Sequence, residues 1–290
     1  MHTRKKLARF LERAGYLIGD DPTKVHVALA RLLGKDRYEQ HLDRADAMIA
    51  GMIPISEVYS GMQSMQEANV LMSFQGHHVL EVNFRLLEHI ADYLATAIEV
   101  VELGCWTGAI SAYVAEMYPG TRFTGVDAQA NAIEFARNKW QRSNLHFSVW
   151  NYAETGIAPA EKVQLLFGVF PLDFRQMEES FRLPSAWSNF SQWDLFDERL
   201  AEAMPYFRNW RSITYSDARL VLALRIPTVQ WLAAVLEAAR RAGWEVDLAN
   251  SLKIKSGDES FPLLQFTALT PGVIAFESSA TDLNEWWKRH

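Results

Sequence analysis

The chain has 290 residues, and 49% of them are hydrophobic, which is enough to bury a substantial core and argues against disorder. Its formal net charge is -6, which disfavours a protein that binds along a nucleic-acid backbone, because that function needs a basic surface. Cys105 is the only cysteine. An internal disulfide and a cysteine-ligated metal cluster are therefore excluded, which fits the reducing cytoplasm.

The sequence does not indicate a membrane span or a secretory signal. No apolar run approaches the roughly 20 residues that a transmembrane helix needs. Arg9, Glu12 and Arg13 interrupt the segment that follows the basic N-terminus. We therefore expect a cytoplasmic protein without a membrane span. We expect no nucleic-acid partner, and the sequence leaves a homodimer open.

The segment 1–95 is predicted to form a helical N-terminal cap. Its apolar residues recur at the spacing of amphipathic helices. The stripes are Leu7, Phe10, Leu11 and Ala14, then Val25, Leu29, Leu32 and Leu33, then Val82, Leu86, Ile90 and Tyr93. Gly34, Gly51 and Gly76 separate the helical runs.

From residue 96 onward, short apolar runs alternate with helical stretches, which predicts an α/β fold. The expected strands are 98–103, 122–126, 145–149, 163–170, 218–225, 244–255 and 261–269. Helices are expected from 109 to just before Pro119, over 131–140 and over 229–242. The pattern predicts a doubly wound, seven-stranded, mostly parallel sheet in 96–272. An aromatic-rich insertion is expected at 171–215 and a C-terminal tail at 273–290.

The segment after the first predicted strand carries the pattern of an adenosine site. Gly104 and Gly108 lie where a strand gives way to a helix, so the backbone can approach a ligand at a helix N-terminus. In doubly wound sheets the ligand lies there, beyond the carboxyl ends of the strands. Asp127 ends the second strand, 127 − 108 = 19 residues beyond Gly108. Its carboxylate can accept hydrogen bonds from both hydroxyls of a ribose.

The residues around this turn favour S-adenosylmethionine over a dinucleotide. The G-x-G-x-x-G spacing that cradles a pyrophosphate is absent, because Cys105, Trp106 and Thr107 follow Gly104. Glu102, just ahead of the turn, would repel a phosphate. Its negative charge suits a ligand that carries a sulfonium and an ammonium group.

With these residues in register, the sequence resembles the class I S-adenosylmethionine-dependent methyltransferases. The resemblance rests on 100–108, on the run 123–127 that ends in Asp127 and on 131–137, and it extends at fold level over about 96–270. It implies a Rossmann-like methyltransferase core with S-adenosylmethionine as cofactor. The implied cofactor-binding residues are Glu102, Gly104, Cys105, Trp106, Gly108, Asp127, Ala128, Asn151, Tyr152, Phe167, Tyr59 and Gln75.

The resemblance also implies roles for these residues. Glu102 and the two glycines would line the methionine and sugar part, and Asp127 would hold the ribose. Asn151 and Tyr152 would flank the adenine. In many relatives a helix ahead of the first strand covers the cofactor, which makes Tyr59 and Gln75 candidate contacts.

The chain departs from the family pattern at three places. Trp106 replaces the usual central glycine, so its side chain must point away from the ligand or form a wall of the pocket. Asn151 replaces a common aspartate, but its amide can still accept a hydrogen bond from the adenine amino group. The segment 168–171 is Gly-Val-Phe-Pro. It is therefore not the Asn/Asp-Pro-Pro-Tyr signature of enzymes that methylate amino groups of nucleic acids.

The interval between the fourth and fifth predicted strands is rich in aromatic residues. From 170 to 215 there are eleven aromatics in 46 residues, about twice the 12% of the whole chain. They include Phe174, Phe181, Trp187, Phe190, Trp193, Phe196, Tyr206, Phe207 and Trp210. Two interpretations stay open: a lid that accepts a small apolar or planar substrate, or the core of a helical subdomain or dimer contact.

The catalytic candidates are fewer, because methyl transfer from a sulfonium needs alignment more than acid–base chemistry. His77 and His78 precede a predicted helix and titrate near neutrality, while Asp173 and Tyr215 flank the expected pocket mouth. His77, Glu81 and Glu88 share a helix face. A metal site there is a hypothesis that we do not adopt, and we predict no metal.

We therefore predict an S-adenosylmethionine-dependent methyltransferase that acts on a small, apolar or aromatic molecule by O-, N- or C-methylation. One alternative is an enzyme that methylates protein or RNA. Another is a non-catalytic subunit that keeps the fold for binding, with Trp286 and Trp287 as a docking tail.

Overall fold

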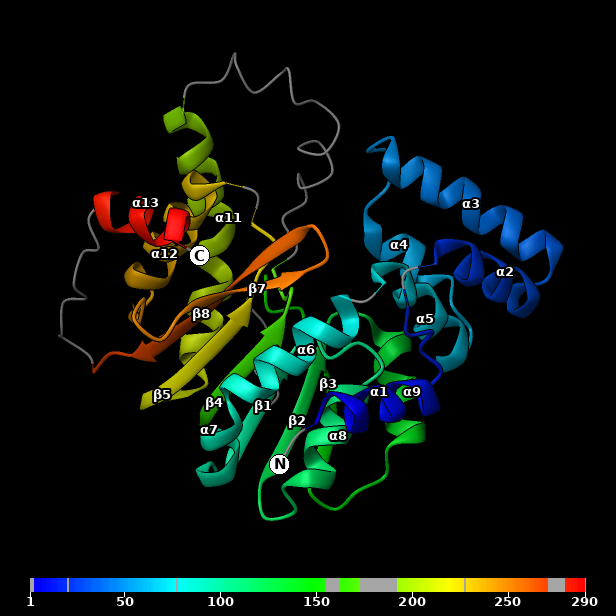
Figure 1. Ribbon diagram of the computed structural model, residues 1–290, viewed down its shortest axis with the longest axis horizontal. Coiled ribbons are helices and arrows are strands. Elements are labelled where there is room, and N and C mark those ends of the chain that lie inside the picture. The colour runs from blue at the N-terminus through cyan, green and yellow to red at the C-terminus, as the bar shows by residue number, and fades with distance from the viewer. Residues whose placement is uncertain are drawn as a thin grey trace.

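The computed structural model describes residues 3–19, 21–76, 78–154, 162–172, 192–226, 228–270 and 280–289. It contains a twisted sheet with helices on both faces, and Figure 1 shows α6 and α7 crossing in front of the sheet while α2 to α5 form a group to one side. Among the described residues, no helix is long and apolar enough to cross a membrane.

The sheet has the order β3-β2-β1-β4-β5-β8-β6, with β7 also paired to β8. Its strands are β1 Glu99–Leu103, β2 Arg122–Asp127, β3 Leu145–Val149, β4 Val163–Val169, β5 Thr214–Ala223, β6 Trp244–Val246, β7 Leu252–Ser256 and β8 Glu259–Ala268. Strands β1 to β5 pair in parallel, and β8 runs antiparallel to β5. The mixed, mostly parallel α/β sheet predicted from the alternating pattern is confirmed.

The last position of the sheet differs from the prediction of one strand over 244–255. Strands β6 and β7 pair with successive parts of β8, at Phe266–Ala268 and Glu259–Leu263 respectively, so they form one interrupted edge. In the gap, the Asp247 amide donates to the carbonyl of Gln265, and the hydroxyl of Ser251 accepts from the amide of Gln265. The sheet therefore has eight strands in seven positions.

The strands alternate their side chains between two apolar layers. Val100 faces a layer built with the helices α1 Arg4–Arg13, α6 His78–His89, α7 Ala91–Thr96, α8 Ala109–Met117 and α9 Ala130–Lys139. Val101 faces a layer built with α11 Gln192–Ser212, α12 Val229–Arg241 and α13 Ala280–Arg289. Burial on both faces explains the apolar runs Val100–Val101 in β1 and Leu220–Ala223 in β5.

The N-terminal helices pack in two separate groups. Helices α1, α6 and α7 belong to the layer on the sheet, whereas a separate lobe consists of α2 Pro22–Leu33, α3 Lys35–Ile49, α4 Ile55–Ser60, α5 Met65–Met72 and the 3-10 helix η1 Ser73–Gln75. This lobe has its own apolar cluster, which includes Leu29, Met62 and Ala68. Trp106 and Ala132 join the cluster from the sheet domain, so the lobe is docked on the predicted cofactor turn.

The C-terminal segment is also part of the molecule's own core. Leu283 and Trp286 of α13 are buried against α12, and Lys253 lies over the ring of Trp287 at 3.8 Å from its centroid. The ring of Trp286 is therefore buried against other residues of this chain. This removes the main reason for regarding the last helix as a tail that docks on a partner.

Candidate functional site

The candidate site starts at the turn 104–108, where β1 ends and α8 begins. The Cys105 amide donates to the Val126 carbonyl at 2.9 Å, which ties the turn to β2. Gly104 and Gly108 have φ angles of 70° and 74°, a region that favours glycine. At Gly108 a Cβ atom would also lie 2.3 Å from Cε1 of Phe147. Both the backbone and the packing thus require glycine at position 108.

Glu102 is a buried carboxyl group directly beneath this turn. Only 7% of the residue is exposed, and the Ser111 hydroxyl of α8 donates a hydrogen bond to its Oε2. Burial raises the pKa of Glu102 from 4.5 to about 8, although the hydrogen bonds from Ser111 oppose that shift and the charge of Asp127 adds to it. A cationic ligand would stabilise the ionised form of this carboxyl.

Asp127 closes the other side of the turn from the end of β2. Its Oδ2 accepts from the amide of Trp106 at 2.8 Å, and its Oδ1 accepts from the amide of Gln129 at 2.9 Å. Burial raises the pKa of Asp127, and these backbone hydrogen bonds partly offset the rise. Each oxygen keeps acceptor capacity for a further partner, because a carboxylate offers about four acceptor positions.

Trp106 has the left-handed backbone conformation in which a glycine is usual, with φ of 51°. Its side chain points into the α2–α5 lobe, where the indole N–H donates to the Ala68 carbonyl at 3.3 Å. The ring also packs edge-on against Tyr59, 4.9 Å between centroids. The sequence left open whether this side chain points away from the ligand or forms a wall of the pocket. It is anchored in the lobe, and its contacts there hold the lobe on the turn.

Three polar residues at the turn were not predicted from the sequence. Asn69 of α5 is fully buried, donates to the Ala14 carbonyl at 2.7 Å and accepts from the Thr107 hydroxyl at 2.5 Å. The Tyr16 hydroxyl also bonds to Thr107, and burial raises the pKa of Tyr16. Asn69 is a polar residue inside an apolar helical run, which does not reveal its partner, and Tyr16 follows α1 with no sequence signal for this contact.

Of the two residues predicted to flank the adenine, Asn151 is exposed to solvent and Tyr152 is buried in the core. Asn151 is exposed, and its side chain bonds to the Ala153 amide and to Glu154. Tyr152 is buried against α11, although its hydroxyl lies 3.4 Å from where a Cβ of Gly104 would be. Phe167 and Cys105 are buried in the layer around α6 and α8, so their side chains serve that core.

Other predicted contacts lie farther along the chain. Ala128 is exposed just after Asp127, Tyr59 is half-buried in the lobe beside Trp106, and Gln75 is half-buried at the end of η1. His77 and Asp173 lie outside the described residues.

Two catalytic candidates lie within the described residues. The His78 ring packs on the β7–β8 hairpin, where Nδ1 lies 2.9 Å from the Ser256 hydroxyl and Nε2 lies 3.2 Å from Glu259. Tyr215 was expected at the pocket mouth, and this is wrong. Strand β5 already begins at Thr214, so Tyr215 lies at its amino-terminal end, on the edge opposite to the glycine turn.

The described part of the aromatic insertion is core. Tyr206, Phe207 and Trp210 of α11 are buried, and Tyr206 and Trp210 both contact the ring of Tyr152. This favours the subdomain interpretation for these three residues. Phe174, Phe181, Trp187 and Phe190, on which the lid hypothesis also depends, lie outside the described residues, and the side chain of Trp193 is not described.

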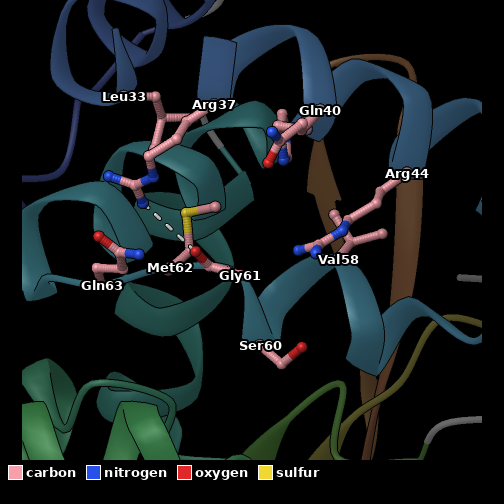
Figure 2. A pocket seen from close by; sticks show the side chains of 10 residues that line it. Leu33, Arg37, Gln40, Arg44, Val58, Ser60, Gly61, Met62 and Gln63 are labelled. Carbon is pink, nitrogen blue, oxygen red and sulfur yellow. Dashed lines mark hydrogen bonds between the residues drawn. The ribbon is translucent and has the colours of Figure 1, made fainter.

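A basic cavity of about 300 Å³ lies in the lobe between α3 and the segment 58–63. Figure 2 shows Arg37 and Arg44 reaching from α3 toward Gly61, whose carbonyl accepts from Arg37. His41 also lines it and is 7% exposed. No residue of the turn 104–108 lines this cavity, so it is separate from the candidate site. Within the described ranges, no group of acidic, histidine or cysteine side chains could hold a metal ion.

The fold and the turn together define a class of protein. The sheet order, the glycine turn after β1 and the acidic residue at the end of β2 are those of the class I S-adenosylmethionine-dependent methyltransferases. Residues 82–164 match the family model of the methyltransferase small domain. This segment contains the whole turn, and S-adenosylmethionine is the cofactor that the class uses.

Individual relatives are distant. The chain is 28% identical over 57 residues to a malonyl-acyl-carrier-protein O-methyltransferase of Acetivibrio thermocellus, a match that covers 20% of each chain. It resembles the N-methyltransferase NodS of Bradyrhizobium japonicum solved with S-adenosylhomocysteine (TM-score 0.50, 14% identity, 74% of this chain and 96% of that chain). Human N-acetylserotonin methyltransferase gives a TM-score of 0.49 at 12% identity, over 84% and 70% of the two chains.

Proposed function

We propose that this chain transfers a methyl group from S-adenosylmethionine to a small molecule. The observation that carries the proposal is the pair of carboxyl groups at the turn, because Glu102 is buried beneath it and Asp127 closes it with acceptor capacity to spare. A dinucleotide would place a pyrophosphate against these acids, and its negative charge would oppose the ionised form of each. A cationic sulfonium ligand fits the same charges.

Each group would have a separate task. Glu102 would attract the cationic methionine part of the cofactor. That positive charge would stabilise the ionised form of Glu102, which burial otherwise disfavours. Asp127 would accept hydrogen bonds from the ribose hydroxyls, while its bonds to Trp106 and Gln129 keep the carboxylate in place. When bound, S-adenosylmethionine supplies an electrophilic methyl group. The chain then needs to align the acceptor and to exclude water.

A small-molecule acceptor is supported by charge. The net charge of -6 favours a small molecule over RNA, which would need compensating cations.

The direct test is turnover with S-adenosylmethionine and a panel of small acceptors, followed by detection of S-adenosylhomocysteine. We expect turnover with at least one small molecule and a strong loss in Glu102→Gln, whose side chain keeps its size but cannot become charged. Turnover only with protein or RNA acceptors would replace the small-molecule proposal by the macromolecular alternative. Absence of cofactor binding by the folded chain would refute methyl transfer altogether.

A further inference from the structure

A second group of functional side chains lies at the carboxyl ends of β4 and β5, next to the cofactor turn in the sheet order. Phe170 follows β4 directly, and Arg225 follows β5 by two residues. Strand β8 runs antiparallel to β5 with Leu263 opposite Ala223, so Phe261 of β8 lies at the same edge. In doubly wound sheets this edge holds the ligands.

Arg225 lies against a pair of aromatic rings there. Its guanidinium carbon lies 4.9 Å from the ring centroid of Phe170 and 5.8 Å from that of Phe261, and the two rings contact each other at 5.1 Å. Aromatic faces attract a guanidinium, but they leave its N–H groups in need of hydrogen-bond acceptors.

The backbone at Phe170 is strained to make this arrangement. Its φ is 54°, a left-handed value that is uncommon for a bulky residue, and its amide donates to the Ala223 carbonyl at 2.8 Å. Strain of this kind is concentrated at functional sites. The ring of Phe170 is thereby fixed at the edge of the sheet, against Arg225.

The charge of Arg225 has no counter-ion in the part of the chain that the structure describes. The side chain is half-buried, and no hydrogen bond or ion pair joins it to a described residue, while Glu259 nearby on β8 is engaged by His78 at 3.2 Å. Removing a charge from water without a partner is unfavourable. A ligand anion is the partner that would offset this cost.

We propose that Arg225 binds a carboxylate of the acceptor molecule and thereby positions it beside the cofactor turn. This inference rests on the proposed function, and it adds the acceptor's chemical class. A carboxylate fits because it is planar and singly charged, so one guanidinium can bind it by two parallel hydrogen bonds. A phosphate would call for further cations, and His78 is already engaged by Ser256 and Glu259.

The test compares an aromatic acid with its neutral amide on protein saturated with S-adenosylhomocysteine. The probes are 4-hydroxybenzoate and 4-hydroxybenzamide, titrated by calorimetry or ligand-observed NMR. We expect the acid to bind at least about tenfold more tightly than the amide, since charge-assisted hydrogen bonds discriminate to that degree. Arg225→Met, which keeps an unbranched apolar side chain, should remove the difference, and Arg225→Lys should retain part of it.

Arg219→Met is the matched control. Arg219 lies six residues earlier on the same chain segment, also rests near an aromatic ring, that of Tyr93, and also carries one positive charge. Acid preference that survives Arg219→Met but not Arg225→Met would support the assignment. Equal binding of acid and amide to wild-type protein that binds S-adenosylhomocysteine would overturn this inference alone. Failure to bind S-adenosylhomocysteine would instead refute the proposed function.

Discussion

At the scale of single residues, Glu102 couples cofactor binding to pH. Its pKa is about 8 in the cofactor-free protein, so the group is mostly protonated at pH 7. A cationic ligand favours the ionised form, and binding should therefore release a proton. Because the folded pKa exceeds the ordinary 4.5, the stabilising proton is lost as pH rises. The free energy of unfolding of the cofactor-free protein should thus fall as the pH rises from about 4.5 toward 8.

We accordingly expect the affinity for S-adenosylmethionine to rise roughly tenfold from pH 6 to pH 7, because each pH unit below the pKa of Glu102 changes its ionised fraction by about that factor. Calorimetric titration at several pH values measures this slope. Glu102→Gln should bind more weakly and show no such slope. A wild-type affinity that stays constant over this range would show that Glu102 does not contact the cationic part of the cofactor.

Gly108 provides a second prediction at this scale. Gly108→Ala combines a left-handed φ with a Cβ that would lie 2.3 Å from Phe147, so we expect a loss of about 3 kcal/mol or more in unfolding free energy. Gly120→Ala is the control, because a Cβ at Gly120 meets nothing within 4 Å. It should change stability by no more than about 0.5 kcal/mol. Equal effects of the two substitutions in urea denaturation would contradict this packing argument.

At the scale of elements, the central question is how the α2–α5 lobe is held on the sheet domain. Trp106 inserts into the lobe's apolar cluster, and Asn69 of α5 bonds to Thr107 in the turn. The cofactor turn is therefore also the docking point of the lobe. Ligand binding at the turn and lobe docking should thus stabilise one another.

Trp106 variants separate the backbone cost from the packing gain. Trp106→Ala should lower the unfolding free energy by about 3–5 kcal/mol, because it empties a buried indole site. Trp106→Gly should be less harmful by about 1 kcal/mol, since glycine relieves the left-handed strain at φ of 51°. Chemical denaturation measures both. If Trp106→Ala were as stable as wild type, the indole would not hold the lobe.

The elements also show what the sequence could and could not predict. The strands around the turn follow from apolar runs and the turn from Gly104, Gly108 and Asp127, because these patterns are local. The contacts of Asn69 and the Trp106 ring depend on how the α2–α5 lobe docks on the turn, 38 residues away along the chain, and the sequence does not show this docking. Tyr215 was misplaced because β5 starts before its apolar run, with Thr214.

At the scale of the whole molecule, one edge of the sheet gathers both candidate sites. The ends of β1 and β2 present two carboxyl groups, and the ends of β4 and β5 present the guanidinium of Arg225 against two aromatic rings. A cationic cofactor and an anionic acceptor would thus lie on opposite charges along neighbouring strands. The chain's net charge of -6 does not reveal this separation, because it appears only when the fold brings the strand ends together.

The most direct test of the central claim is calorimetric titration of the folded chain with S-adenosylmethionine, for wild type and Asp127→Asn. Asparagine keeps one oxygen that can accept a hydrogen bond from the turn's backbone amides. Asp127→Ala would leave the amides of both Trp106 and Gln129 without this acceptor. We predict one site per chain with a dissociation constant in about the micromolar range, weakened at least about tenfold in Asp127→Asn. No binding by folded wild-type protein, or equal binding by the variant, would contradict the claim.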